Sequence, residues 1–256
     1  MGTPAEATPK LSKSEQTRSL ILQTALELFR ERGYEETTMR AIAERANISL
    51  GNTYYYFKSK EVLIQEFYAH THGEHVLASA PVLAQEKTLK GRLLGVMKAK
   101  LTTIQPYHAF SGVLFKTAAD PKSPLNPFSE DSTRTREEST ELFAEVLRGA
   151  KGKVPLELQS ELANLLWVYH MGVVLFWIHD NSPGCRRTHL LVDHTVDIIV
   201  KLIALASTPL LIPLRKKILK MMTDLRQTAG EIGTPDTLPV ELENSEEVEE
   251  ADPVAE

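Results

Sequence analysis

Residues 37–63 read TTMRAIAERANISLGNTYYYFKSKEVL, and they predict two short helices joined by a tight turn. Thr38 fits the N-cap of the first helix, and Ser49 fits the N-cap of the second. Between them, Asn47 tolerates the left-handed backbone conformation that such a turn needs. Two short helices joined by about three residues form a helix-turn-helix when a longer helix braces them.

Longer helices are expected on both sides of this pair. Ser12 and Glu15 have the spacing of a capping box at the start of the first, and Gly33 fits its C-terminal end. Ser59 fits the cap of the helix that follows the pair. Because strand patterns are scarce and helical periodicity recurs along the chain, the predicted fold class is all-α.

A second helical region begins beyond about residue 80, where prolines recur and each is expected to mark a helix edge. These prolines are Pro81, Pro106, Pro121, Pro124, Pro127, Pro155 and Pro183. The expected helices cover residues 88–104, 107–118, 131–149, 156–180 and 187–206. An extra amphipathic helix is expected over residues 210–227.

The stretch 37–63 resembles the helix-turn-helix of the TetR (tetracycline repressor-like) family of transcriptional regulators. Its turn, serine, glycine, Tyr-x-Tyr-Phe and Ser-Lys-Glu all fall in the family's register, and the similarity covers about residues 14–75. Asn47 replaces the usual turn glycine, and Thr53 replaces an apolar residue that normally packs inward, which we expect to loosen the second helix slightly. The resemblance implies an N-terminal three-helix DNA-binding domain followed by a helical ligand-binding and dimerisation domain.

The predicted organisation has five parts, and the last is strongly acidic. Residues 231–256 contain ten acidic residues and no Lys or Arg, which leaves 29 basic against 24 acidic residues, a net charge of +5, in the rest of the chain. The acidic run is expected to be disordered, with competition for the protein's own basic surface as the alternative. The parts are a disordered leader (1–11), the helix-turn-helix DNA-binding domain (12–75), the ligand-binding and dimerisation domain (76–208), a basic amphipathic helix (209–229) and the disordered tail (230–256).

The second helix of the pair carries three consecutive tyrosines beside lysines, a composition that suits contact with phosphates. The resemblance implies that the residues facing base edges are Arg40, Leu50, Gly51 and Asn52. It implies that those holding the DNA backbone are Tyr54, Tyr56 and Lys60. An arginine can bond guanine in a bidentate manner, and this would read sequence. The expected DNA-binding set also includes Thr38 and Ser49, and Tyr55 is left open between groove contact and packing.

Residues 162–178, LANLLWVYHMGVVLFWI, are apolar on every side, as a fully buried helix requires. A membrane span is the alternative, but Asn164 and His170 interrupt the run and no second span accompanies it, so no membrane partner is expected. We expect the helices at 156–180 and 187–206 to form the four-helix bundle of a homodimer. Reading a palindrome requires two recognition helices about one DNA turn apart.

Aromatic and methionine side chains of the second region are candidates to line an apolar effector site, although such residues more often fill plain core. The candidates are Met97, Phe110, Phe115, Trp167, Met171, Phe176 and Trp177.

The remaining polar clusters are interpreted as structural. His70, His72 and His75 have a spacing that suits a metal, but an ordinary polar helix end is the favoured interpretation, and neither a metal nor a cofactor is expected. His170 and the histidines and aspartates after it lack a nucleophile at a compelling spacing, so no catalysis is expected. Cys185 is interpreted as a passive loop thiol, and a single cysteine suits a reducing cytoplasm.

The sequence therefore predicts a cytoplasmic, homodimeric transcriptional repressor that a small, largely apolar effector releases from a palindromic DNA operator. The alternatives are an all-α enzyme or a protein-interaction adaptor that carries a helix-turn-helix. The basic helix at 214–226 is expected to fold onto its own domain, with contact to DNA or a membrane surface as the alternative.

Overall fold

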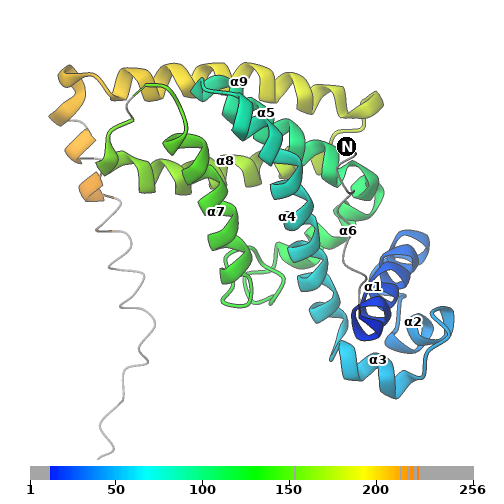
Figure 1. The fold of residues 1–256 in the computed structure, drawn as a ribbon. Helices are drawn as coiled ribbons and strands as arrows, with labels where there is room; N and C mark the ends of the chain where they lie inside the picture. Colours follow the sequence, from blue (N-terminus) through cyan, green and yellow to red (C-terminus); the bar gives the residue numbers. More distant parts are fainter. Residues whose placement is uncertain (1–11, 153, 214, 218, 222–223, 225–256) are drawn as a thin grey trace, which may run out of the picture. The chain divides into compact units, whose positions relative to one another are not determined.

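The computed structural model describes residues 12–152, 154–213, 215–217, 219–221 and 224 (Figure 1). The predicted leader and acidic tail lie outside the described residues, as does part of the predicted basic helix. The chain divides into two compact units, residues 1–212 and 213–256, and the fold below is that of the first. Over its described residues this unit is all-α, with one isolated β-bridge between Thr88 and Lys151. Its α-helices are α1 (Lys13–Arg32), α2 (Met39–Arg45), α3 (Leu50–Tyr56), α4 (Lys60–Gln85), α5 (Leu89–Ile104), α6 (His108–Ala118), α7 (Thr133–Arg148), α8 (Leu156–Ile178) and α9 (Arg186–Ala206).

The four predicted N-caps of the first helices are confirmed. Ser12 Oγ accepts the backbone N–H of Glu15 at 3.2 Å, and the Glu15 carboxylate accepts the Ser12 N–H at 2.7 Å, which completes the capping box. The side chains of Thr38, Ser49 and Ser59 each accept a backbone N–H at the start of α2, α3 and α4.

The turn between α2 and α3 has the predicted geometry. Asn47 has a φ of 54°, in the left-handed region, and this redirects the chain between the two short helices. Thr53 is fully buried on the inner side of α3, the inward position that the resemblance implies. Its hydroxyl donates to the carbonyl of Ser49, so the polar group at this inward position has a partner.

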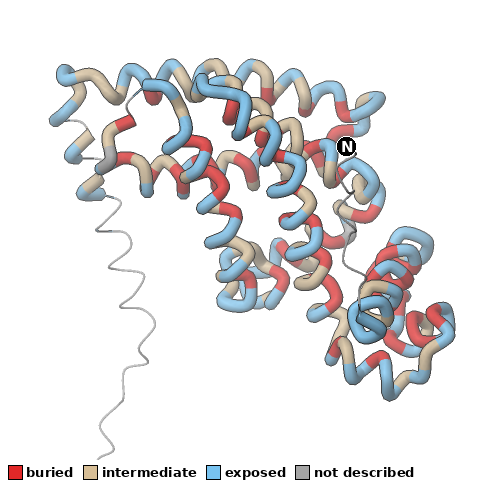
Figure 2. The backbone as a smooth tube through the Cα atoms, in the orientation of Figure 1, coloured by how far each residue is buried: buried red, intermediate tan, exposed pale blue. Residues whose placement is uncertain are grey.

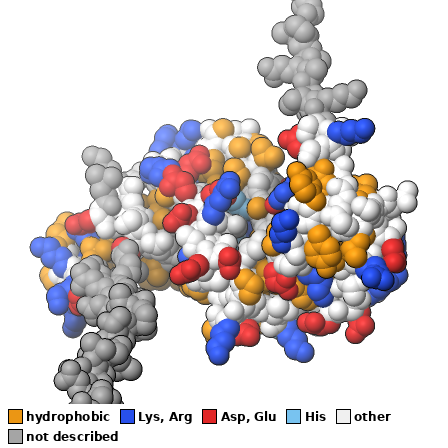
Figure 3. Space-filling model, turned by 90° about the horizontal axis from the view of Figure 1, so that it is seen from below, with side chains coloured by type: hydrophobic (Ala, Val, Ile, Leu, Met, Phe, Trp, Pro, Cys, Tyr) orange, Lys and Arg blue, Asp and Glu red, His pale blue; other side chains and the backbone are white. Residues whose placement is uncertain are grey.

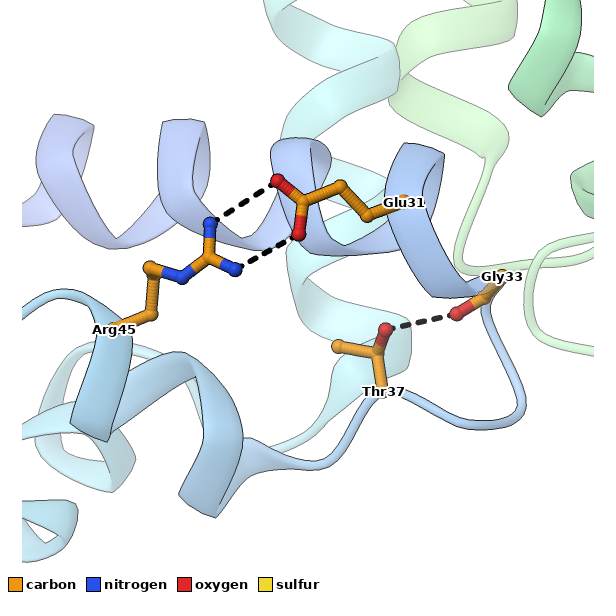
Figure 4. A network of polar contacts seen from close by, with 4 residues as sticks. All are labelled: Glu31, Gly33, Thr37 and Arg45. Carbon is orange, nitrogen blue, oxygen red and sulfur yellow. Dashed lines mark hydrogen bonds and ion pairs between the residues drawn. The ribbon is translucent and has the colours of Figure 1, made fainter.

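Two polar contacts brace α1 against α2 and the loop that joins them (Figure 4). Arg45 forms a bidentate ion pair with Glu31, with nitrogen–oxygen distances of 2.8 and 3.1 Å. The Thr37 hydroxyl donates to the carbonyl of Gly33, whose φ of 87° ends α1. These contacts hold the first helix across the pair, the arrangement that a helix-turn-helix requires.

The N-terminal hydrophobic core extends into α6. Phe110 of α6 stacks on Phe29 of α1, with ring centroids 5.5 Å apart, and lies 6.1 Å from the ring of Phe67 on α4. Leu114 and Ala118 of α6 belong to the same cluster of buried side chains. The helices on either side of α4 therefore share one core.

Pro81 does not mark a helix edge, and in this respect the sequence prediction is wrong. It lies inside α4, which continues to Gln85 and passes through the predicted domain boundary at residues 75–76 without a break. Pro81 is exposed, and so is Leu77, whose carbonyl would have received the missing N–H. Water can therefore serve that carbonyl, which makes a proline tolerable at this point.

The helices predicted for the second region are confirmed within a few residues at each end. Helix α4 packs on α5, α7 packs on α8, and α9 packs on α5 and α8. Figure 2 shows buried and exposed positions alternating along α8 and α9. The segment Glu157–Ile178 of α8 is long and apolar enough to cross a membrane by length and composition, with a mean hydropathy of 1.4 over its most apolar 18 residues. Of those 18 residues, 39% are buried within the protein.

Candidate nucleic-acid interface and internal cavity

Helix α3 turns one side to solvent and the other to the core. Gly51, Asn52, Tyr54 and Tyr55 are exposed, and Tyr55 has 71% of its surface accessible. Leu50 and Tyr56 are half-buried and pack against the N-terminal core. In Figure 3 the part of the molecule that contains α2 and α3, on the right, shows hydrophobic side chains with both basic and acidic side chains around them.

Arg40 is exposed on α2 and makes no hydrogen bond or ion pair with any other described residue. The same holds for Lys58, between α3 and α4. By contrast, Arg18 pairs with Glu66 at 2.7 Å. Arg40 is therefore a cation whose hydrogen-bond donors remain available to a ligand, whereas the exposed hydroxyls of Thr38 and Ser49 already cap their helices.

Lys60 is placed differently from the other predicted DNA contacts. Its ammonium donates to the carbonyl of Tyr34 at 2.8 Å and to that of Glu35 at 3.4 Å, and it lies 4.3 Å from the centre of the Tyr34 ring. The Tyr34 hydroxyl donates in turn to Glu61 at 2.9 Å, and burial together with this carboxylate raises the pKa of Tyr34. Lys60 thus links the start of α4 to the residues that follow α1. A contact between Lys60 and a DNA phosphate stays a prediction.

A cavity of about 210 Å³ lies between α4, α5, α6, α7 and α8. Four of the seven predicted ligand residues line it, namely Phe115, Trp167, Met171 and Trp177. The other three are outside its wall. Met97 is buried in the core, Phe110 packs between Phe29 and Phe67, and Phe176 faces Arg187. Helical periodicity cannot distinguish these positions because core and cavity both take apolar side chains.

The histidines near residue 72 do not form a polar helix end, which corrects the sequence interpretation. His72 and His75 lie in the middle of α4 and are buried. The ring of His75 stacks on that of His170 with centroids 5.9 Å apart, and its Nε2 bonds the carbonyl of Val96 at 2.9 Å. Burial is the main cause that lowers the pKa of His75 to about 3 and holds the pKa of His170 well below its usual range, so both rings are neutral at pH 7.

The other polar residues singled out in the sequence have structural partners. Asp180 accepts hydrogen bonds from the backbone N–H and the hydroxyl of Thr188 at the start of α9, which lowers the pKa of Asp180 although burial opposes this. Asp193 pairs with Lys98 at 2.7 Å. Cys185 is buried. Among the described residues, no group of three or more His, Cys, Asp or Glu is arranged to hold a metal ion.

Family models match both halves of this architecture. The model of the tetracyclin repressor-like C-terminal domain matches residues 92–224, and that of the bacterial regulatory proteins of the tetR family matches residues 21–67. The chain therefore belongs to the tetR family of regulators.

Individual relatives agree with this assignment. The transcriptional repressor KstR2 of Mycolicibacterium smegmatis is 30% identical over 131 residues, which cover 50% of this chain and 62% of KstR2. The regulator UidR of Escherichia coli is 43% identical over 54 residues, 21% of this chain and 28% of UidR. The matched segments thus span less than two thirds of either relative.

Solved structures share the fold. A putative TetR-family regulator from Syntrophomonas wolfei superposes with a TM-score of 0.60 at 17% identity, covering 73% of this chain and 96% of that one. FadR from Bacillus subtilis, solved in complex with stearoyl-CoA, superposes with a TM-score of 0.56 at 16% identity, covering 70% and 96%.

Proposed function

We propose that this protein is a homodimeric transcriptional repressor in the bacterial cytoplasm, released from a palindromic DNA operator by a small-molecule effector. The observation that carries the proposal is the continuous core that joins the solvent-facing helix α3 to the cavity. The family assignment and the name of the KstR2 repressor support it.

On DNA, α3 enters the major groove with its exposed side first. Gly51 lets the backbone approach closely, and Arg40 from α2 reads a base through its free guanidinium. Tyr54 and Tyr56 donate their hydroxyls to phosphates, which fixes the register of the helix without reading sequence. Lys58, free and exposed beside them, adds positive charge at the same edge.

A second copy of the chain covers the outer sides of α8 and α9. Leu165, Val168 and Leu175 are exposed along α8, at helical spacings of three and seven residues. Helix α9 continues this apolar surface, and its exposed members are Leu190, Ile198, Leu202 and Leu205. The hydroxyls of Tyr169 and Thr195, 2.6 Å apart, tie the two helices together. Two such pairs form the four-helix bundle of a dimer, which buries these apolar side chains and accounts for the apolar outer side of α8 without a membrane.

The effector acts through side chains that belong to the core and to the cavity wall at once. Phe67 of α4 and Leu114 of α6 line the cavity and also pack in the N-terminal core. Because well-packed cores are only slightly compressible, an effector that displaces them shifts α1 and α4, and with them α3. Effector and operator affinities are then reciprocally coupled.

Selection of binding sites from random duplex DNA tests the DNA-binding part of the proposal. The protein should enrich a palindromic sequence, and Tyr54→Phe, which removes a single hydroxyl, should weaken binding to all sequences by a similar factor. Enrichment of no sequence at moderate salt would refute the proposal.

Light scattering after size-exclusion chromatography tests the dimer. The Ile198→Asp/Leu202→Asp variant should be monomeric and should lose operator binding, because each charge would be buried in the interface. Leu77→Asp, at an exposed leucine on α4, is the matched control and should stay dimeric. A dimeric double variant would exclude this surface as the interface.

A further inference from the structure

We propose that the effector is an amphipathic carboxylic acid, whose carboxylate binds Lys100 and His170 while its apolar body fills the aromatic part of the cavity. The inference rests on the proposed function, since it names the chemical class that this cavity accepts.

The charges around the cavity are unbalanced. Lys100 and Arg136 are among the residues described as lining it, and no Asp or Glu is. The Arg136 guanidinium already uses three of its five N–H donors, because it donates to the carbonyls of Pro127 and Ser129 and to the hydroxyl of Thr133. The ammonium of Lys100 has no hydrogen bond or ion pair with any described residue. Two cations therefore border the cavity without a carboxylate partner among the described residues, and Lys100 is the one whose donors are all unused.

No acidic side chain among the described residues forms an ion pair with Lys100. Glu74 on α4 raises the pKa of Lys100 through its charge without pairing with it. Glu138 on α7 pairs with Arg134 at 2.9 Å. Burial dominates and lowers the pKa of Lys100 to about 8, which leaves the amine mostly charged at pH 7. The half-buried ammonium has lost part of its hydration without gaining a partner, and an anionic ligand would relieve that cost.

His170 supplies a second unpartnered polar group at the same place. Its ring is 4% exposed and lines the cavity, and neither ring nitrogen has a hydrogen-bond partner among the described residues. A neutral imidazole has one N–H donor, and buried donors without partners are rare in folded proteins. The charge of Lys100 contributes to lowering the pKa of His170, so the two groups interact electrically. A carboxylate has two oxygens, one for each donor.

The rest of the cavity is apolar and largely aromatic. Its wall includes Phe67, Tyr107, Phe115 and Trp177. Its volume of about 210 Å³ exceeds the roughly 150 Å³ of an engineered cavity that holds benzene. An acid with an aromatic ring or a medium-length alkyl chain therefore matches both the polar and the apolar parts.

Tryptophan fluorescence provides a direct test that does not depend on DNA. The chain has two tryptophans, Trp167 and Trp177, and both line the cavity, so a ligand that enters should change the emission. The probes are phenylacetate, 4-phenylbutanoate, octanoate and decanoate, each compared with its primary amide. We expect at least one acid to bind about tenfold or more tightly than its amide, the factor typical of a charge-assisted hydrogen bond.

Substitutions identify the groups that recognise the anion. Lys100→Met should abolish the preference of acid over amide, and Lys100→Arg should retain most of it. Lys98→Met is the matched control, because Lys98 lies two residues away and pairs with Asp193 at the surface. His170→Phe should weaken binding of the acid more than that of the amide.

The outcomes separate this inference from the proposed function. The inference is overturned if no acid binds, or if acids and amides bind equally. It is also overturned if Lys100→Met still prefers acids over amides while its operator binding shows that it folds. In each case the proposed DNA binding is unaffected. Loss of the preference in Lys100→Met, with operator binding equal to that of Lys98→Met, supports it. A wild-type protein that binds acids as expected but selects no DNA sequence would refute the proposed function alone.

Discussion

The surface around α3 and the cavity beside the middle of α4 hold polar groups in opposite ways. At the surface, Arg40 and Lys58 face water and keep their donors free for a large anionic partner. In the cavity, Lys100 of α5 and His170 of α8 lack hydrogen-bond partners among the described residues. Exposure makes the first set inexpensive to maintain, whereas burial makes the second costly until a ligand binds. Free donors at a surface are commonplace, whereas unpartnered donors inside a protein are informative.

The largest effect is expected where the two regions share a core. Phe110→Ala should lower the free energy of unfolding by about 3–5 kcal/mol, because the fully buried ring contacts both Phe29 and Phe67. Chemical denaturation measures this, with Phe128→Ala, at an exposed phenylalanine, as the control. A loss below about 1 kcal/mol for Phe110→Ala would show that the core is not continuous.

Arg40→Ala should act on recognition without acting on folding. We expect it to remove about 1–3 kcal/mol of discrimination at one base position in each half-site, since the guanidinium has no partner among the residues that the structure describes. Binding-site selection with the variant measures the base preference. An unchanged preference profile would assign the arginine to phosphate contact or to no contact.

Ser49→Ala should cost about 1 kcal/mol of stability, because the side chain caps α3 by accepting the N–H of Asn52 at 3.2 Å. Ser49→Asp keeps an acceptor at the cap, so its thermal stability should remain near that of the wild type. Its negative charge should nevertheless weaken DNA binding if this position faces phosphates. Equal operator affinity for Ser49→Asp and the wild type would place Ser49 away from the DNA backbone.

The smallest expected effects are those of Lys60→Met and Lys58→Met, which should differ in stability and in the salt dependence of DNA binding. Lys60→Met should lower stability by about 0.5–1.5 kcal/mol through the lost bonds to Tyr34 and Glu35, whereas Lys58→Met should leave stability unchanged. The salt dependence of DNA binding then separates the two roles, because each lost phosphate contact reduces the slope by about 1. If only Lys58→Met changes the slope, Lys60 stabilises the domain through its bonds to Tyr34 and Glu35 and does not contact DNA.

The N-terminal fold could be predicted from sequence because its signals are local. A cap acts over three residues, and a left-handed turn needs only the right residue at one position, so Ser12, Ser49 and Asn47 could be assigned one by one. The helices of the second region followed from periodicity in the same way. Pro81 was misjudged because its effect depends on whether the freed carbonyl of Leu77 faces water, which only the tertiary structure decides.

The polar part of the cavity could not be predicted, for a physical reason. Lys100 and His170 stand 70 positions apart on α5 and α8, and no pattern along the chain shows that they border the same space. His170 interrupts an apolar run, and its sequence context indicates only a structural role. Its unpaired ring nitrogens became visible only once every neighbour was placed. The sequence predicts part of the apolar wall of the cavity but not the positive charge of Lys100 beside it.

The length of α4 has a mechanical consequence. A helix of 26 residues is about 39 Å long, so it acts as a lever whose far end travels further than any of its side chains. A rotation of about 5° around its C-terminal end would carry its first turn by about 3 Å, close to the rise of one base pair. A displacement too small to disrupt either domain would therefore suffice to move the α3 helices of two protomers away from the spacing of successive major grooves.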